Sequence, residues 1–251
     1  MQRTKVGVAD YGLNVWDGAC LDTERRLGEL RAIGYDGLER LEGADTEDAM
    51  YKAARFRALG MDFATCRGPT PETGIRWTAA FGKRYVWTDS AATDFDVFCR
   101  QVNHQVEVCA GWGIRVGLHN HLGSVVESQQ QLEAFMDACP DCGLVFDTAH
   151  LAAADGDPLE IVSKYRDRMV MVHVKDWFVT NPEIGLGDGW YNRGRFCELG
   201  AGNIGMDNAA VVKALIDGGY EGWICVEHDT HLRDPLADLA HSREYLREAG
   251  V

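Results

Sequence analysis

The sequence is poor in positive charge and contains no long apolar run. Its 25 Lys and Arg residues face 39 Asp and Glu residues, which gives a net charge of −14 at pH 7. This charge disfavours nucleic acid and anionic membranes as partners, because the general electrostatic term would be repulsive. No stretch approaches the roughly 18 consecutive apolar residues that a membrane-spanning helix needs. Residues 1–5 lead into a short strand and do not resemble a signal peptide, so we expect a cytoplasmic protein.

Cysteine is also scarce, with eight residues scattered over a chain of 251. This is too few for a disulfide scaffold. Cys139 and Cys142 form one CxxC motif, in the turn between a predicted helix and the next strand. A redox pair would instead stand at a helix N-terminus that follows a strand, and a zinc site would need a second CxxC motif. We therefore expect these two cysteines to be structural.

The sequence is rich in short apolar runs that end in polar, chemically competent residues. This pattern is typical of parallel strands, which are buried along their length and present their ligands at their carboxyl ends. Such runs occupy residues 114–121, 144–150, 170–176 and 223–228.

Strand and helix patterns alternate about eight times without a linker, which predicts a single-domain (β/α)8 TIM barrel over residues 1–251. Predicted strands cover residues 5–10, 37–41, 62–66, 85–87 and 115–119, then end at Asp147, His173 and Glu227. Predicted helices cover residues 23–33, 45–59, 94–110, 128–139, 157–165, 207–216 and 235–248. Residues 68–82 carry a weak helical pattern, and residues 177–206 read as a long glycine-rich loop, a type that is uncommon unless it is functional.

Strand periodicity places several metal-binding residue types on one side of the predicted sheet. Side chains alternate between faces, so Asp147, His173 and Glu227 share the barrel side with His119. Carboxylates and imidazoles that meet at one mouth are typical ligands of Mn²⁺, Zn²⁺ or Co²⁺. The sequence therefore predicts a divalent-metal site at this end of the barrel.

Three other motifs are less compatible with their surroundings. Residues 200–205 form a GxGxxG pattern, but the strand that should precede a dinucleotide fingerprint is missing from residues 193–199. Residues 113–127 approximate a cupin metal motif, although a helix follows and the chain is not all-β. The HxH pair at His119 and His121 is typical of amidohydrolase barrels, but there it ends the first strand and here the fifth.

From the fifth strand to the C-terminus the chain resembles the xylose-isomerase-like barrels, which include sugar epimerases, hydroxypyruvate isomerases and keto-inositol dehydratases. The nearest subgroup is the inosose dehydratases. The motifs that carry the resemblance are residues 119–127, 146–150, 173–176, 200–204 and 226–227.

The resemblance implies a divalent metal, usually Mn²⁺ or Co²⁺, with Zn²⁺ or Mg²⁺ as alternatives. The implied ligands are Asp147, His173, Glu227 and the residue at position 119. Many family members have Glu at that fourth position, whereas this chain has His119. The change removes one base of a two-glutamate epimerase shuttle and favours dehydration.

The resulting hypothesis is a lyase that acts on a small keto-polyol or keto-sugar, such as a keto-inositol or a 3-keto-glycoside. The metal would stabilise an enediolate, and the β-substituent would then leave. Catalytic roles are expected for Glu227 or a nearby carboxylate as the base, for His121 or His150 as the acid, and for Lys175 at the developing oxyanion. Expected substrate-binding residues are Trp16, Glu42, Glu127, Asp176 and Trp177.

Return of the proton would instead make the protein an isomerase or epimerase by the same route. Two interpretations lie outside this class: a barrel related to zinc endonucleases, against which the net charge of −14 argues, and a non-catalytic binding barrel. Soluble barrels are often homo-oligomers, and the sequence leaves both a monomer and a homo-oligomer open.

Overall fold

The computed structural model describes residues 4–10, 22–227, 229 and 233–251. Eight strands form one sheet in the order β3-β2-β1-β10-β7-β6-β5-β4, and every neighbouring pair is parallel. The ends of this sheet meet where the Thr65 hydroxyl of β3 donates a hydrogen bond to the Tyr85 carbonyl oxygen of β4. The strands are β1 (Lys5–Val8), β2 (Gly37–Glu42), β3 (Asp62–Arg67), β4 (Tyr85–Trp87), β5 (Arg115–His119), β6 (Gly143–Asp147), β7 (Met169–Val174) and β10 (Trp223–Val226).

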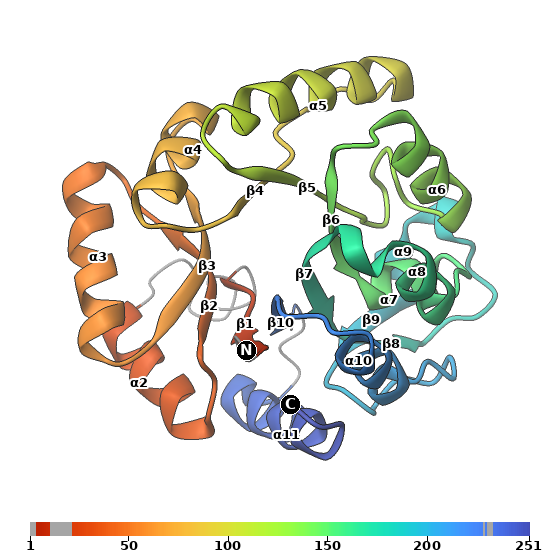
Figure 1. Cartoon of the computed structure of the whole chain (residues 1–251). Helices are drawn as coiled ribbons and strands as arrows, with labels where there is room; N and C mark the ends of the chain where they lie inside the picture. The colour runs from red at the N-terminus through yellow and green to blue at the C-terminus, as the bar shows by residue number, and fades with distance from the viewer. Residues whose placement is uncertain (1–3, 11–21, 228, 230–232) are drawn as a thin grey trace.

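Helices follow the strands and form a ring around the sheet (Figure 1), which confirms the predicted (β/α)8 barrel. They are α2 (Thr23–Ile33), α3 (Thr46–Ala58), α4 (Pro71–Ala80), α5 (Phe95–Ala110), α6 (Gln129–Ala138), α8 (Pro158–Tyr165), α10 (Asn208–Asp217) and α11 (Pro235–Glu248). Asp, Ser or Thr side chains cap the N-terminus of each of these helices by accepting from a backbone amide of the first turn. In the part of the chain that the structure describes, we find no helix with the length and apolarity needed to cross a membrane.

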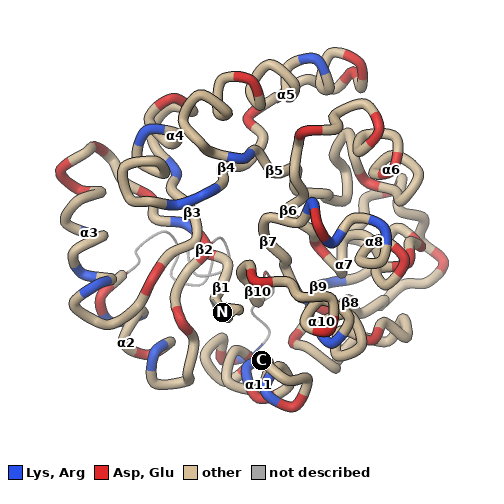
Figure 2. The backbone as a smooth tube through the Cα atoms, viewed as in Figure 1, with Lys and Arg blue, Asp and Glu red and all other residues tan. Residues whose placement is uncertain are grey.

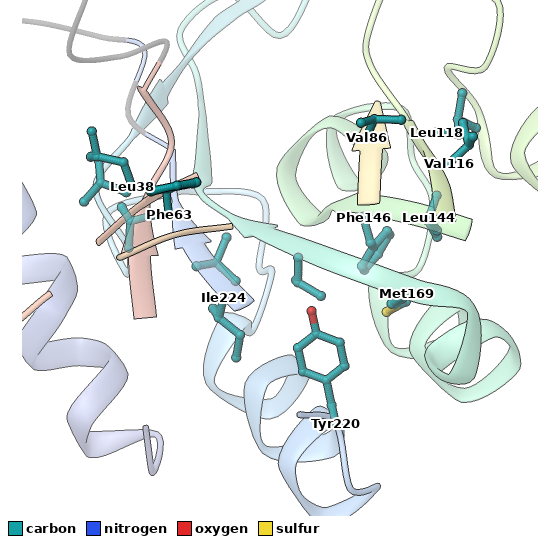
Figure 3. Packing of buried hydrophobic residues seen from close by; sticks show 14 of the residues in the cluster. Leu38, Phe63, Val86, Val116, Leu118, Leu144, Phe146, Met169, Tyr220 and Ile224 are labelled. Carbon is teal, nitrogen blue, oxygen red and sulfur yellow. The ribbon is translucent and has the colours of Figure 1, made fainter. Parts of the chain in front are cut away.

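The alternation of side chains along each strand divides the core into two layers. Leu144 and Phe146 of β6 belong to the larger cluster between sheet and helices, whereas Val145 between them belongs to a small cluster inside the barrel. Figure 3 shows Leu38 beside Phe63, which are partners in the register of β2 and β3. Asp147 lies two residues after Val145, so its side chain is on the same face of the strand and points to the barrel interior, as predicted.

The structure adds a helix after one predicted strand and corrects one predicted loop. Residues 148–150, which continue the β6 motif in the sequence, begin a helix, α7 (Thr148–Ala153), because the Asp147 carboxylate caps it by accepting from the His150 amide. Residues 177–206 are not a plain loop. They contain an antiparallel pair, β8 (Asp176–Val179) with β9 (Gly194–Cys197), and a short helix, α9 (Trp190–Arg193). The 3-10 turns are η1 (Arg166–Arg168) and η2 (Leu186–Asp188).

The pair β8–β9 forms because its aromatic side chains find a core of their own. Trp177 and Phe196 are cross-strand partners, with ring centroids 4.9 Å apart, and both are buried. Trp190 of α9 packs on the same two rings. This cluster lies close to the carboxyl end of β7 and to α7, and therefore beside the predicted site.

Candidate metal centre

The four predicted ligands come together at the carboxyl ends of β5, β6, β7 and β10. His119, Asp147, His173 and Glu227 each offer one ligand atom, and these atoms all lie within 4.8 Å of one another. The parallel register produces this convergence, because Asp147 is opposite His173 and the residue two positions before Glu227 is also opposite His173. Asp147 and His173 are fully buried.

Two buried atoms of this cluster have no well-directed hydrogen bond among the described residues, although the Lys175 ammonium lies 2.7 Å from one of them, and a metal ion would satisfy both. They are Nδ1 of His173 and Oε2 of Glu227, which lie 2.9 Å apart. Oδ2 of Asp147 lies 3.8 Å from the same Nδ1 and 3.4 Å from Nε2 of His119. Buried polar atoms without partners are rare in folded proteins. Two imidazoles and two carboxylates are a suitable donor set for a divalent transition metal, so these residues fit the implied ion.

Glu39 of β2 determines how His173 faces the cluster. Its carboxylate is fully buried; Oε2 lies 3.0 Å from Nε2 of His173, and Oε1 accepts a hydrogen bond from the Trp87 indole at 2.7 Å. Because Nε2 is directed at Glu39, Nδ1 is directed at Asp147 and Glu227. Burial disfavours the imidazolium, but the Glu39 and Glu227 carboxylates outweigh it and hold the pKa of His173 well above its usual value. Metal ligation therefore competes with a proton at Nδ1.

Lys175 places a buried ammonium against three carboxylates. Its Nζ lies 2.7 Å from Glu227, 3.1 Å from Asp147 and 3.1 Å from Asp229, and 4.3 Å from the centre of the Phe196 ring. Burial would raise the pKa of Asp147 and Glu227, but the Lys175 charge outweighs it and holds both well below their usual values. The same carboxylates keep Lys175 protonated, with its pKa raised despite burial. Both ligand carboxylates are thereby kept ionised, as metal binding requires.

His121 and His150 form a stacked pair that is oriented by the backbone of Leu122. The ring centroids are 3.7 Å apart. The Leu122 amide donates to Nδ1 of His150 at 3.2 Å, and Nδ1 of His121 lies 2.6 Å from the Leu122 carbonyl oxygen, which can only accept. Burial and the nearby Lys175 charge lower the pKa of His150 well below its usual value. His150 is therefore neutral.

Residues 27–249 match the protein family described as xylose isomerase-like TIM barrel. An inosose dehydratase from Lactiplantibacillus plantarum is 33% identical over 241 residues, which cover 88% of this chain and 77% of that protein. The chain belongs to the xylose isomerase-like TIM barrel family.

Solved structures agree with this family at the level of the fold. An L-ribulose 3-epimerase superposes with a TM-score of 0.72 at 17% identity, covering 98% of this chain and 94% of that one. The probable 3-DHS dehydratase AsbF from Bacillus anthracis gives 0.74 at 11% identity, covering 97% and 99%. The family and its dehydratase relatives confirm the resemblance seen in the sequence, and they make the chain an enzyme of the lyase or isomerase type.

Several residues that were expected to contact the substrate have other partners in this xylose isomerase-like barrel. Asp176 is buried and accepts hydrogen bonds from the amides of Trp177 and Gly200, so it holds the glycine-rich segment against β8. A Cβ at Gly202 would collide with the Asp176 carboxylate, which shows that a side chain of the protein itself fills the anion position of the GxGxxG pattern. Trp177 is fully buried in the aromatic cluster, where it supports Trp190.

The remaining three candidates differ in position. Glu127 is half-buried and accepts from the Gly123 amide at 2.9 Å, which closes the loop that follows His121. Glu42 is half-buried and lies 3.5 Å from Arg67, on the opposite face of β2 from Glu39. Trp16 lies outside the described residues.

Sequence reasoning missed Glu39 and Asp229. The signal for Glu39 was strand parity, since residues 39 and 42 of one strand point to opposite faces and only one of them can face the barrel interior. Asp229 lies two residues beyond Glu227, where strand periodicity no longer applies. Its Oδ1 is buried without a hydrogen bond to any described residue, and burial raises its pKa to about 6 against the opposing effect of Lys175.

Proposed function

We propose that this protein is a divalent-metal-dependent lyase that eliminates water or another β-substituent from a keto-polyol or keto-sugar, with a keto-inositol as the first substrate to test. The observation that carries the proposal is the buried cluster of His119, Asp147, His173 and Glu227, whose ligand atoms all lie within 4.8 Å of one another and in which Nδ1 of His173 and Oε2 of Glu227 have no well-directed hydrogen bond among the described residues. The dehydratase relatives support elimination as the reaction.

The four-residue cluster would hold the ion, and Mn²⁺ is the ion that we expect. A bound divalent ion supplies Lewis acidity that makes the α-proton of a ketone easier to remove. Lys175 keeps the ligand carboxylates charged, and it can stabilise negative charge that develops on the substrate oxygen.

Carboxylates at the end of β10 are placed to accept the α-proton. Glu227 is both a proposed ligand and the predicted base, and Asp229 adds a second carboxylate on the same ammonium. Because Oδ1 of Asp229 is without a hydrogen bond from the described residues, it is an acceptor that remains available. We assign proton abstraction to this pair, Glu227 and Asp229.

His121 is the proton donor that the geometry favours for the leaving group. Its Nδ1 is committed to the Leu122 carbonyl oxygen, so Nε2 exchanges the proton. His150 is less suited, because its Nδ1 accepts from the backbone and its Nε2 lies 3.3 Å from the Lys175 ammonium. General-acid catalysis of this kind contributes about 10²–10⁴-fold.

Trp87 and Trp190 provide aromatic surfaces on either side of the histidines. The Trp87 ring lies 4.6 Å from the His119 ring, and the Trp190 ring lies 6.3 Å from the rings of both His121 and His150. Such surfaces suit the C–H faces of a sugar or inositol ring, and they exclude water from the reacting carbons.

The test is proton NMR of a keto-inositol incubated in D₂O with Mn²⁺-loaded enzyme, with the ion removed before each spectrum. Loss of ring signals with an enolic or dione product would establish elimination. Deuterium entering the α-position of an otherwise intact ring would establish the isomerase or epimerase alternative. If neither a keto-inositol nor a 3-keto-glycoside changes, the proposed substrate class is wrong.

A further inference from the structure

A cavity lies at the end of the barrel opposite the proposed metal centre, where the strands begin. It encloses about 540 Å³, within the range of small-molecule sites. Residues at the starts of β1, β3, β4, β5, β7 and β10 line it. Since β7 and β10 carry His173 and Glu227 near their carboxyl ends, this cavity is separated from the proposed metal centre by the length of the barrel.

The charge of this cavity is opposite to that of the protein. Five cationic side chains line it against three carboxylates, whereas the whole chain carries −14. Figure 2 shows Lys and Arg segments close to β3 and β4, among helices that mostly carry mixed charge. The cations are Lys5, Lys83, Arg84, Arg115 and Arg166.

The cations are only partly neutralised by their neighbours. Lys5 and Lys83 both bind the single carboxylate of Asp62. The Arg84 side chain is exposed and makes no hydrogen bond or ion pair with the part of the chain that the structure describes. Nε of Arg166 is buried without a hydrogen bond from described residues, and its nearest carboxylate, that of Asp167, is 3.5 Å away and 92% exposed.

Arg166 differs from Arg168, a neighbouring arginine that binds backbone carbonyl oxygens at the end of α6. The Arg168 guanidinium donates hydrogen bonds to the carbonyl oxygens of Met136, Cys139 and Cys142, so its donors are used within the protein. Arg168 does not line the cavity. Arg166 instead lies across the backbone at Gly218, where a Cβ would collide with its guanidinium. The glycine therefore leaves room for this arginine at the cavity wall.

The walls between these charges are aromatic. The Lys5 ammonium lies 5.3 Å from the Trp223 ring and that of Lys83 lies 4.3 Å from the Phe63 ring, so both are held by cation–π contacts as well as by Asp62. Tyr85 also lines the cavity, and its buried hydroxyl has no hydrogen-bond partner among described residues. Guanidinium forks on the wall of one cavity suit the several oxygens of a phosphate group.

We propose that this cavity binds a small molecule that carries a phosphate group, at a site independent of the metal centre. Free phosphate and a phosphate ester present the same oxygens to Arg84 and Arg166, so both are candidate ligands. The proposal does not depend on the lyase assignment.

The test is calorimetric titration of inorganic phosphate into the metal-loaded protein at fixed ionic strength. We expect saturable binding that weakens about tenfold or more in Arg84→Gln and in Arg166→Gln, because each substitution removes charge-assisted hydrogen bonds. Arg100→Gln is the matched control, since Arg100 is exposed on α5 and lies outside the cavity. Wild-type melting temperatures of the two cavity variants would show that the fold is retained.

Two results would overturn the proposal: no saturable binding of phosphate, or binding that both cavity variants retain at wild-type strength. In the second case, loss of binding in Asp147→Ala would show that phosphate had bound at the metal centre instead. A parallel titration with glycerol 3-phosphate separates the two sources. Tighter binding than that of phosphate would identify an ester as the natural ligand, and equal or weaker binding would identify free phosphate.

Discussion

Replacing Glu39 by Gln should weaken metal binding although Glu39 is not itself a proposed ligand. The carboxylate lies 3.0 Å from Nε2 of His173 and keeps Nδ1 directed at Asp147 and Glu227. Loss of such an outer partner of a ligating histidine typically costs about 10–100-fold in metal affinity. This corresponds to about 1.4–2.8 kcal/mol. Glutamine keeps the shape of the side chain and removes only the charge, so the change isolates the electrostatic contribution.

The assay is calorimetric titration of Mn²⁺ into chelator-treated protein, with the melting temperature measured in parallel. Trp87→Phe is the matched control, because it removes the indole donor to Glu39 at 2.7 Å and leaves the carboxylate on His173. We expect Glu39→Gln to bind Mn²⁺ at least tenfold more weakly, and Trp87→Phe to lie closer to the wild type. Wild-type affinity in Glu39→Gln would refute the role that we assign to this carboxylate.

Three further predictions concern the ligands, the proton donor and the stability in acid. Asp147→Ala should lose both bound metal and turnover, and a fully active variant would exclude the proposed centre. His121→Phe keeps a ring on His150 and should lower kcat by about 10²–10⁴-fold at unchanged Mn²⁺ affinity; wild-type kcat would remove His121 from the mechanism. Burial would raise the pKa of Asp62, but hydrogen bonds from Lys5 and Lys83 outweigh it and lower that pKa. The ionised carboxylate therefore stabilises the fold above its pKa in the unfolded chain, which is about 4, and this contribution is lost as the pH falls through its lower pKa in the folded protein. The fall in melting temperature between about pH 5 and pH 3 should therefore be smaller in Asp62→Asn than in the wild type, and an equal fall in both proteins would contradict this.

Element positions were predictable wherever local signals and tertiary packing agree. The Asp157-Pro158 pair predicts the start of a helix, and the structure begins α8 there. Gly34 predicts the end of another helix, and it follows α2 in the left-handed region at φ 105°. The six residues of α7 are too few to show helical periodicity, so only the Asp147 cap reveals that helix. The β8–β9 pair depends on contacts between Trp177 and Phe196, which are 19 positions apart and have no local signature.

The ligand cluster was predictable because a parallel barrel brings all strand ends to one mouth. Parity along the strand then selects the residues that face inward, as at Asp147 and His173. The same rule would have chosen Glu39 over Glu42 on β2. The contacts of Lys175 with three carboxylates were not predictable, since they depend on how far a long side chain extends across the mouth and on Asp229, which follows the end of its strand.

The imidazole at position 119 and the roles of the other two histidines are connected. The resemblance seen in the sequence implies a carboxylate at this position in many relatives, whereas this chain has His119, whose ring lies within 5.8 Å of the rings of His121, His150 and His173. The resemblance implies that a carboxylate there would be the second base of an epimerase, whereas an imidazole is a neutral ligand and adds no such base. The only carboxylates that we assign to proton abstraction, Glu227 and Asp229, then lie together on the Lys175 ammonium, and His121 is left to protonate the departing group. We infer that a set of bases confined to this one strand end favours elimination over proton return by a second base.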